Sequence, residues 1–406
     1  MALEQYTNIL IQLTRDSRND TNAQLTGLTK LSSLFSDTSD ATSAISLQLE
    51  TQSHLTKAVH RAITSNMTIP RICSIGLRIL SHMGHLNEDI SKTLLFKENV
   101  LETAVETLRT HNGDVGAVRS ALCLLTTVLG RANNESATIK FQRIHMIGST
   151  LNAVLLQHID DAPTVEWGLA SCCFVGRYGG NDLPSTVICC IETHPTDLGV
   201  VRTGLSACCS LARTNESNRV SLIGCGAFDV ARTCLDLRPA HREMTVIISS
   251  LIGYLLKSKL GRNSILRGDN SRLVKLLAGC FPAQSDVQAS WFPLCLRSVT
   301  TALTMVSLSS VAARTLLIED CEVVEQLNEI LELKLPNLRL RFDVEMALAA
   351  IKGELEEDAK ERLFIDIDDN KTIEFGSSSR LNREKGQIMK TTKNHLGTIG
   401  MKMGTR

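Results

Sequence analysis

Residues 200–235 read VVRTGLSACCSLARTNESNRVSLIGCGAFDVARTCL, and this stretch decides the fold. Its first half carries small and apolar residues at spacings of three and four, among them Gly204, Ala207 and Leu211. Residues at these spacings lie on one side of an α-helix. Small side chains let a neighbouring helix approach closely, and one helix cannot bury such a stripe alone. The stretch therefore predicts helices that stack against similar units.

The same pattern recurs along the chain at intervals of roughly 36 to 50 residues, which is typical of stacked helical repeats. The clearest pair is GLASCC around Gly168 and GLSACC around Gly204, which lie 36 residues apart. Further stretches are centred on Gly76, Ala121, Ser249 and Val299. A last helix is expected over RFDVEMALAAIKGELEE at 341–357.

The central stretch resembles one armadillo repeat. In that family a helix of this kind is followed by a turn, an Asn-Arg pair, an aliphatic residue and a Gly-Ala pair that opens the next helix. Here these are Asn218–Arg219, Ile223 and Gly226–Ala227. The resemblance implies an all-α, armadillo/HEAT-type right-handed α-solenoid and a role in binding proteins.

Four parts are predicted along the chain. A helical cap and loop over residues 1–53 precede a repeat solenoid over 54–355. A connector or short hairpin is expected over 356–375, because Leu363 and the following isoleucines alternate with polar residues.

An extended basic tail over residues 376–406 completes the chain. It carries seven basic residues against one acidic residue, Glu384, and such a composition cannot bury enough apolar surface to fold alone. The basic residues are Arg380, Arg383, Lys385, Lys390, Lys393, Lys402 and Arg406.

The overall charge is balanced, with 43 basic and 43 acidic residues. A net charge near zero offers no global attraction to nucleic acid or to an anionic membrane, so neither is expected as a partner. No run of 18 apolar residues occurs, and the first 20 residues lack a secretory apolar core. The thirteen cysteines, several at predicted core positions such as Cys172 and Cys208, are expected to be free thiols in a reducing compartment.

Motifs for catalysis or metal binding are weak. Residues 366–377 are similar to a calcium loop, but Lys371 replaces the glycine at its sixth position and Ser377 replaces the bidentate glutamate at its twelfth. The Cys-Cys pairs lack the C-x2-C spacing of zinc sites, and no phosphate-binding or nucleophile motif occurs. We therefore expect no metal, cofactor or catalytic residue, although a Cys-His pair formed in space stays open at this level.

Armadillo proteins that hold extended peptides carry an asparagine near the end of each third helix, and importins add a tryptophan nearby. The asparagine positions here hold other residues, namely His82, Thr127, Phe174, Ser210 and Met305. The tryptophan positions hold Arg78, Cys123, Ala170 and Ser206. The resemblance therefore does not extend to nuclear-signal recognition. It leaves a groove for a folded partner or a helix, and this groove is expected to be lined by the five residues at the asparagine positions.

The sequence thus predicts a non-catalytic scaffold that holds proteins in a larger, cytoskeletal or ciliary/axonemal assembly. Its basic tail would dock on acidic surfaces such as tubulin or axonemal components. The expected location is the cytoplasm, including the cytoskeleton or cilium. Two alternatives stay open: a soluble adaptor or chaperone cofactor that binds clients reversibly, and a tail that is only solvated.

Overall fold

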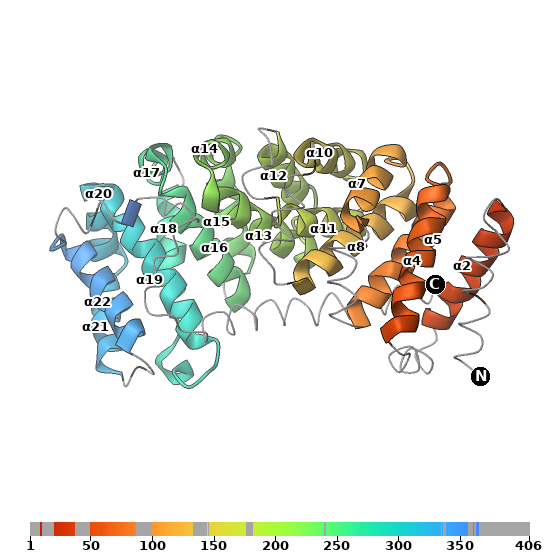
Figure 1. The fold of residues 1–406 in the computed structure, drawn as a ribbon. Coiled ribbons are helices and arrows are strands. Elements are labelled where there is room, and N and C mark those ends of the chain that lie inside the picture. The colour runs from red at the N-terminus through yellow and green to blue at the C-terminus, as the bar shows by residue number, and fades with distance from the viewer. Residues whose placement is uncertain are drawn as a thin grey trace. The chain divides into compact units, whose positions relative to one another are not determined.

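A computed structural model of the chain describes residues 20–36, 49–86, 99–132, 146–175, 182–238, 241–268, 270–333 and 338–355, with residues 9, 144, 335, 360, 363 and 364. Every regular element in these ranges is helical (Figure 1). The helices form two compact units, which we describe separately. The first unit contains the described residues up to Ala132, and the second contains those from Ile144 to Phe364.

The first unit has three long helices that lie side by side and two helices that cover them. The long helices are α2 (Thr21–Ser36), α5 (Pro70–Leu86) and α8 (Val115–Ala132). The covering helices are α4 (Leu49–Ser65), which packs on α5, and α7 (Val100–Thr110), which packs on α8. Each pair buries one apolar stripe per helix, as the sequence pattern requires.

The second unit repeats this arrangement five times. Its second helices are α10 (Ile147–Gln157), α12 (Leu183–Thr193), α15 (Ala227–Leu237), α18 (Asn270–Ala278) and α21 (Val323–Glu332). They pack on the third helices α11 (Ala162–Cys172), α13 (Leu198–Thr214), α16 (Arg242–Leu255), α19 (Phe292–Ser309) and α22 (Leu338–Lys352). Consecutive third helices also pack on one another.

The last three repeats of this unit begin with a short first helix. These helices are α14 (Glu216–Gly224), α17 (Lys259–Ser264) and α20 (Val311–Thr315), which continues into a π-helical turn, η4 (Leu316–Asp320). A 3-10 turn, η3 (Gln284–Asp286), precedes α19. In the described residues the repeat around Gly204 has only two helices, α12 and α13, in agreement with the short interval between Gly168 and Gly204.

The structure confirms the predicted all-α, armadillo-type repeat architecture. The stretches centred on Gly76, Ala121, Gly168, Gly204, Ser249 and Val299 all lie in third helices. The last predicted helix begins three residues earlier than expected and ends at Lys352, where Gly353 takes a left-handed backbone with φ of 79°. The right-handed sense of the solenoid stays a prediction.

Other predictions fall partly or wholly on residues outside the described ranges. Of the expected first helix over residues 3–15, only Ile9 is described, and the calcium-like loop and the basic tail are not described at all. Of the connector, Leu363 and Phe364 are described, and both have a helical backbone. The remainder of the connector lies outside the described residues, and the hairpin stays a prediction.

The Gly-Ala pair of the armadillo signature has a clear conformational reason. Gly226 precedes α15 and has a φ of 88°, a left-handed backbone that glycine adopts without steric cost. The equivalent residue before the second helix is Asn99 in front of α7, Met146 in front of α10 and Glu322 in front of α21, each with φ between 49° and 56°. The turn is therefore repeated even where the glycine is not.

Helix α19 is the one helix in the described part of the chain that is long and apolar enough to span a membrane. Most of its residues are buried, and it packs between α16 and α22. Its apolar character is therefore that of a core helix inside the solenoid.

Close packing between second and third helices depends on a glycine in two repeats. A Cβ atom placed on Gly204 would lie 2.5 Å from Cγ1 of Ile191 in α12 and 3.5 Å from Cδ1 of Leu169 in α11. A Cβ atom on Gly76 would lie 2.5 Å from Cγ1 of Ile63 in α4. The small residue that marks the repeat in the sequence is therefore a point of close helix approach.

We expect a Gly204→Leu variant to lose about 1 to 3 kcal/mol of stability, because the new side chain overpacks this contact. Circular dichroism at 222 nm during thermal unfolding would show a lower melting temperature. Gly224→Leu is the matched control, since no atom lies within 4 Å of the position of its Cβ. Equal melting temperatures for the two variants would contradict the assigned packing.

Candidate functional site

The candidate site is the groove face, which we define as the side of the third helices that the second helices leave uncovered. In the second unit it runs over α11, α13, α16, α19 and α22. Equivalent positions recur on successive helices, for example Ser206 on α13, Ser250 on α16 and Thr301 on α19. The first two are half-buried and the third is exposed. The repeat therefore presents a row of accessible side chains.

In the first unit the predicted groove residues lie on α5 and α8. His82 is exposed to solvent near the end of α5, but enough atoms crowd around its ring to desolvate it, and this desolvation, followed by the positive charge of Arg78, lowers the pKa of His82. Thr127 is half-buried on α8, and its hydroxyl lies 3.0 Å from the hydroxyl of Ser81 on α5. His82 is thus open to a partner as a neutral ring, whereas Thr127 also ties neighbouring third helices together.

In the second unit two predicted residues lie beside each other on the groove face. Phe174 is half-buried just after α11. Ser210 on α13 donates a hydrogen bond of 2.5 Å to the carbonyl oxygen of Cys173, the residue that caps α11. The aromatic ring is therefore partly available, and the serine holds the two third helices in register.

Met305 is placed differently from the prediction. Only 3% of it is exposed, so it belongs to the core of α19 rather than to an open groove. Thr301, one turn earlier on the same helix, is exposed. The prediction failed at Met305 because spacing places a residue on a face of a helix but does not say how closely the neighbouring helices cover that face.

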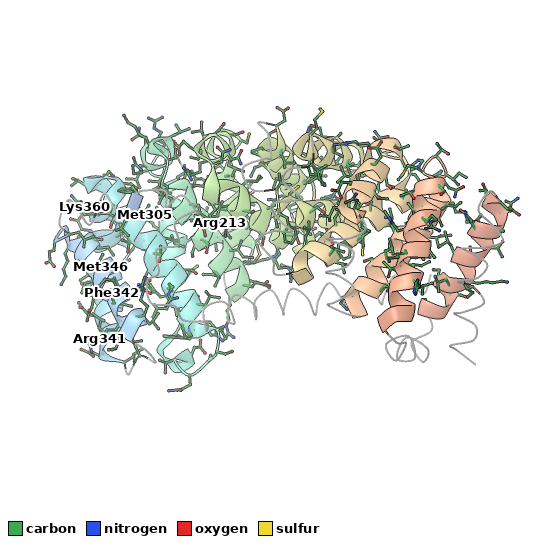
Figure 2. The ribbon with its side chains drawn as sticks, in the orientation of Figure 1. Arg213, Met305, Arg341, Phe342, Met346 and Lys360 are labelled. Carbon is green, nitrogen blue, oxygen red and sulfur yellow. The ribbon has the colours of Figure 1, made fainter. Side chains whose placement is uncertain are left out.

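Extending the same row to the helices on either side finds residues that the sequence analysis missed. Tyr254 on α16 stands at the place of Ser210, and Met346 on α22 at that of Met305, and both are half-buried. Phe342, one turn before Met346, is 50% exposed. Figure 2 shows Phe342 and Met346 following one another along α22, with Met305 on α19. The repeat pattern around Gly204 could have found them, had α16 and α22 been aligned to it.

Basic residues lie where two third helices end. Arg213 is exposed in the last turn of α13, and Lys257 is half-buried two residues after α16. We call Arg213 and Lys257 the basic rim. A cation at the carboxyl end of a helix interacts favourably with the exposed carbonyl groups. This interaction is sufficient to explain why basic residues occur at these two helix ends.

Histidines and an arginine at helix ends have a structural role. Nε2 of His111, after α7, lies 2.6 Å from the carbonyl oxygen of Met67, and Nε2 of His194, after α12, lies 2.6 Å from that of Ile159. Arg238, after α15, donates to the carbonyl oxygen of Pro195 over 2.9 Å. These contacts join the turns of successive repeats. Their role in stacking explains why these residues stand just after the second helices.

Six of the thirteen cysteines are buried in the core, six are half-buried and Cys189 is exposed. All thirteen are free thiols, and burial raises the pKa of Cys172 and Cys208 well above the ordinary value. Burial also raises the pKa of Cys173 to about 12. A thiol with a raised pKa is protonated at neutral pH, whereas the thiolate is the nucleophile and the metal ligand. Within the described residues, no group of three histidine, cysteine or acidic side chains could hold a metal ion.

No protein-family model and no curated protein matches the chain. Several solved structures are similar in fold. An engineered protein from the Northeast Structural Genomics Consortium has a TM-score of 0.55 at 12% identity, over 96% of this chain and 99% of that chain. The structure of Uso1-2 has a TM-score of 0.56 at 13% identity, over 89% of this chain and 62% of that chain. A designed armadillo repeat protein matches 69% of this chain at a TM-score of 0.40.

At these identities the similarity concerns the fold alone. The two structures with TM-scores above 0.5 agree with the helical repeat that the packing of second and third helices shows.

Proposed function

We propose that the chain is a non-catalytic scaffold that holds other proteins on its groove face. The observation that carries this proposal is the groove face of α22, where Phe342 is 50% exposed and Met346 lies half-buried one turn away. Aromatic and methionine side chains are enriched at protein interfaces, where they supply large contact areas. Scattered apolar residues are common on protein surfaces, but these two adjoin each other on the face that the repeat leaves open.

The raised pKa values of buried thiols such as those of Cys172 and Cys208 disfavour these cysteines as nucleophiles. We further propose that the assembly is cytoskeletal or ciliary, with tubulin or axonemal components as partners, in the cytoplasm. The seven basic residues of the tail, residues 376–406, support this part of the proposal, because a positively charged segment is attracted to acidic surfaces. The alternative is a soluble adaptor or chaperone cofactor that binds client proteins reversibly.

Fractionation of cells that express tagged variants would test the scaffold. We expect the full chain in the detergent-resistant cytoskeletal fraction, and we expect Phe342→Glu to move at least half of it to the soluble extract. Val311→Glu is the matched control, because Val311 is 68% exposed but lies on the first helix α20, away from the groove face. A chain that is soluble in every variant would favour the adaptor, and equal retention of all variants would contradict the groove.

Sedimentation with purified microtubules would test the tail. We expect removal of residues 376–406 to abolish co-sedimentation while leaving the melting temperature nearly unchanged, since the tail composition buries little. Raised salt should have the same effect on the full chain, because the screening length between exposed charges falls from about 8 Å at physiological ionic strength to about 3 Å at 1 M salt. Equal sedimentation of truncated and full chains at every salt concentration would show that the tail is only solvated.

A further inference from the structure

After its last third helix the chain turns back toward the repeat before it. Helix α22 ends at Lys352, and Leu355 and Lys360 are half-buried. The ring of Phe364 then lies against the guanidinium group of Arg262, with 4.4 Å between the Cζ atom and the ring centroid. Arg262 belongs to α17, the first helix of the preceding repeat. Phe364 therefore marks a place where the returning chain contacts the solenoid.

The contact with Phe364 lies at the carboxyl end of α16. Arg262 donates hydrogen bonds to the carbonyl oxygens of Leu256, over 3.2 Å, and Lys257, over 2.8 Å. A guanidinium group held in this way offers its flat face to an aromatic ring, which is a favourable cation–π arrangement. Because Lys257 is itself part of the basic rim, the chain reaches the rim at Phe364.

The five residues that follow Phe364 are complementary to the rim. They read IDIDD over 365–369, so three acidic residues occur within five positions. In an extended segment, Asp366 and Asp368 would share one side while Ile365 and Ile367 share the other. Of the acidic residues near the end of α13, Glu216 already pairs with Arg219 over 2.8 Å, which reduces its repulsion of an incoming carboxylate.

The distances along the solenoid also fit. Neighbouring packed helices are about 8 to 10 Å apart, and α13 packs directly on α16. Five extended residues span about 16 Å, which is enough to pass from the end of α16 to the end of α13. Asp366 could therefore meet Lys257, and Asp368 or Asp369 could meet Arg213.

We propose that residues 365–369 dock in cis along the basic rim, which is thus a binding surface for an extended acidic segment with alternating apolar residues. The isoleucines would lie toward the groove face near Tyr254. A docked segment would occupy part of the surface that we assign to partners. This consequence rests on the proposed function, whereas the docking itself does not.

Photo-crosslinking in the full chain tests the position of the segment. With benzoylphenylalanine in place of Ile367, we expect products of monomer mass whose crosslinks map to the last turns of α13 and α16. Arg213→Glu with Lys257→Glu should reduce the yield at least ten-fold. Arg341→Glu is the control, because Arg341 is exposed on α22 away from the rim, and it should leave the yield unchanged. Crosslinks in dimers, elsewhere on the chain, or insensitive to the rim charges would overturn the proposal.

A peptide of residues 363–375 added in trans gives an independent measurement on the full chain. In a variant of the full chain with Asp366, Asp368 and Asp369 changed to asparagine, the rim should be available to the added peptide. The peptide should then bind at least ten-fold more tightly to this variant than to the unchanged chain. A peptide with the same three changes should bind at least ten-fold more weakly than the acidic peptide. Equal affinity for both chains, or no binding to either, would contradict docking in cis. Neither measurement uses a cellular partner, so its failure is separate from failure of the scaffold.

Discussion

A Gly261→Ala variant is expected to lose about 3 kcal/mol of stability, although it adds only one methyl group. Gly261 is buried in α17, and a Cβ atom there would overlap the carbonyl oxygen of Leu255 and lie 2.8 Å from its carbonyl carbon. Overpacking typically costs about 1 to 3 kcal/mol. We expect the upper end of this range because the obstacle is backbone of α16, which cannot rotate away as a side chain does.

The measurement is the denaturant midpoint, followed by circular dichroism, with Gly253→Ala as the control. Gly253 lies in α16 itself, and no atom lies within 4 Å of the position of its Cβ. Replacing a helical glycine by alanine without a clash stabilises a helix by up to about 1 kcal/mol, so the two variants should shift the midpoint in opposite directions. Shifts of the same sign would show that α17 does not approach α16 as closely as the structure has it.

The same region shows why the repeats could be only partly predicted. The Asn-Arg pair at Asn218–Arg219 was visible in the sequence, but its counterpart in the next repeat is Gly261–Arg262. Arg262 still donates to carbonyl groups at the end of the preceding third helix, as Arg219 does. The function of the arginine is kept while the asparagine is lost, so a search for the pair misses this repeat.

Repeat boundaries were hidden for a related reason. The left-handed turn before each second helix is the structural requirement, and glycine is only one way to meet it. Met146 and Glu322 take the same backbone conformation as Gly226 at some steric cost, which the surrounding packing must offset. The stripe of small residues was a better guide, because close helix approach at Gly76 and Gly204 leaves no space for another side chain.

The groove residues were less predictable than the fold. Spacing placed Phe174 and Ser210 on the groove face, but whether a residue is accessible depends on its neighbours in space. Met305 is covered, whereas Phe342 remains half exposed on α22, beyond which no further described third helix packs. The basic rim was missed because Arg213 and Lys257 are brought to the ends of adjacent helices only when α13 packs on α16.

An Arg219→Met variant is also expected to lose about 3 kcal/mol. Arg219 is only 2% exposed, and it donates to the carbonyl oxygen of Ala212 over 2.9 Å and to Oε2 of Glu216 over 2.8 Å. Ala212 lies in the last turn of α13, where carbonyl groups have no partner within the helix. Each hydrogen bond that involves a charged group contributes about 1.5 to 3 kcal/mol, and removing the donor also leaves a buried carbonyl unsatisfied.

Two further variants separate this capping contact from charge alone. Arg219→Lys keeps the charge but cannot reach both acceptors with a planar group. Its stability should therefore lie between the stabilities of the wild type and of Arg219→Met. Arg341→Met removes an arginine whose side chain is 58% exposed and pairs with Glu345 over 2.9 Å, and exposed pairs contribute at most about 1 kcal/mol. If Arg219→Met and Arg341→Met lowered the denaturant midpoint equally, the armadillo arginine would not hold the end of the third helix here, and its place in the repeat would need another explanation.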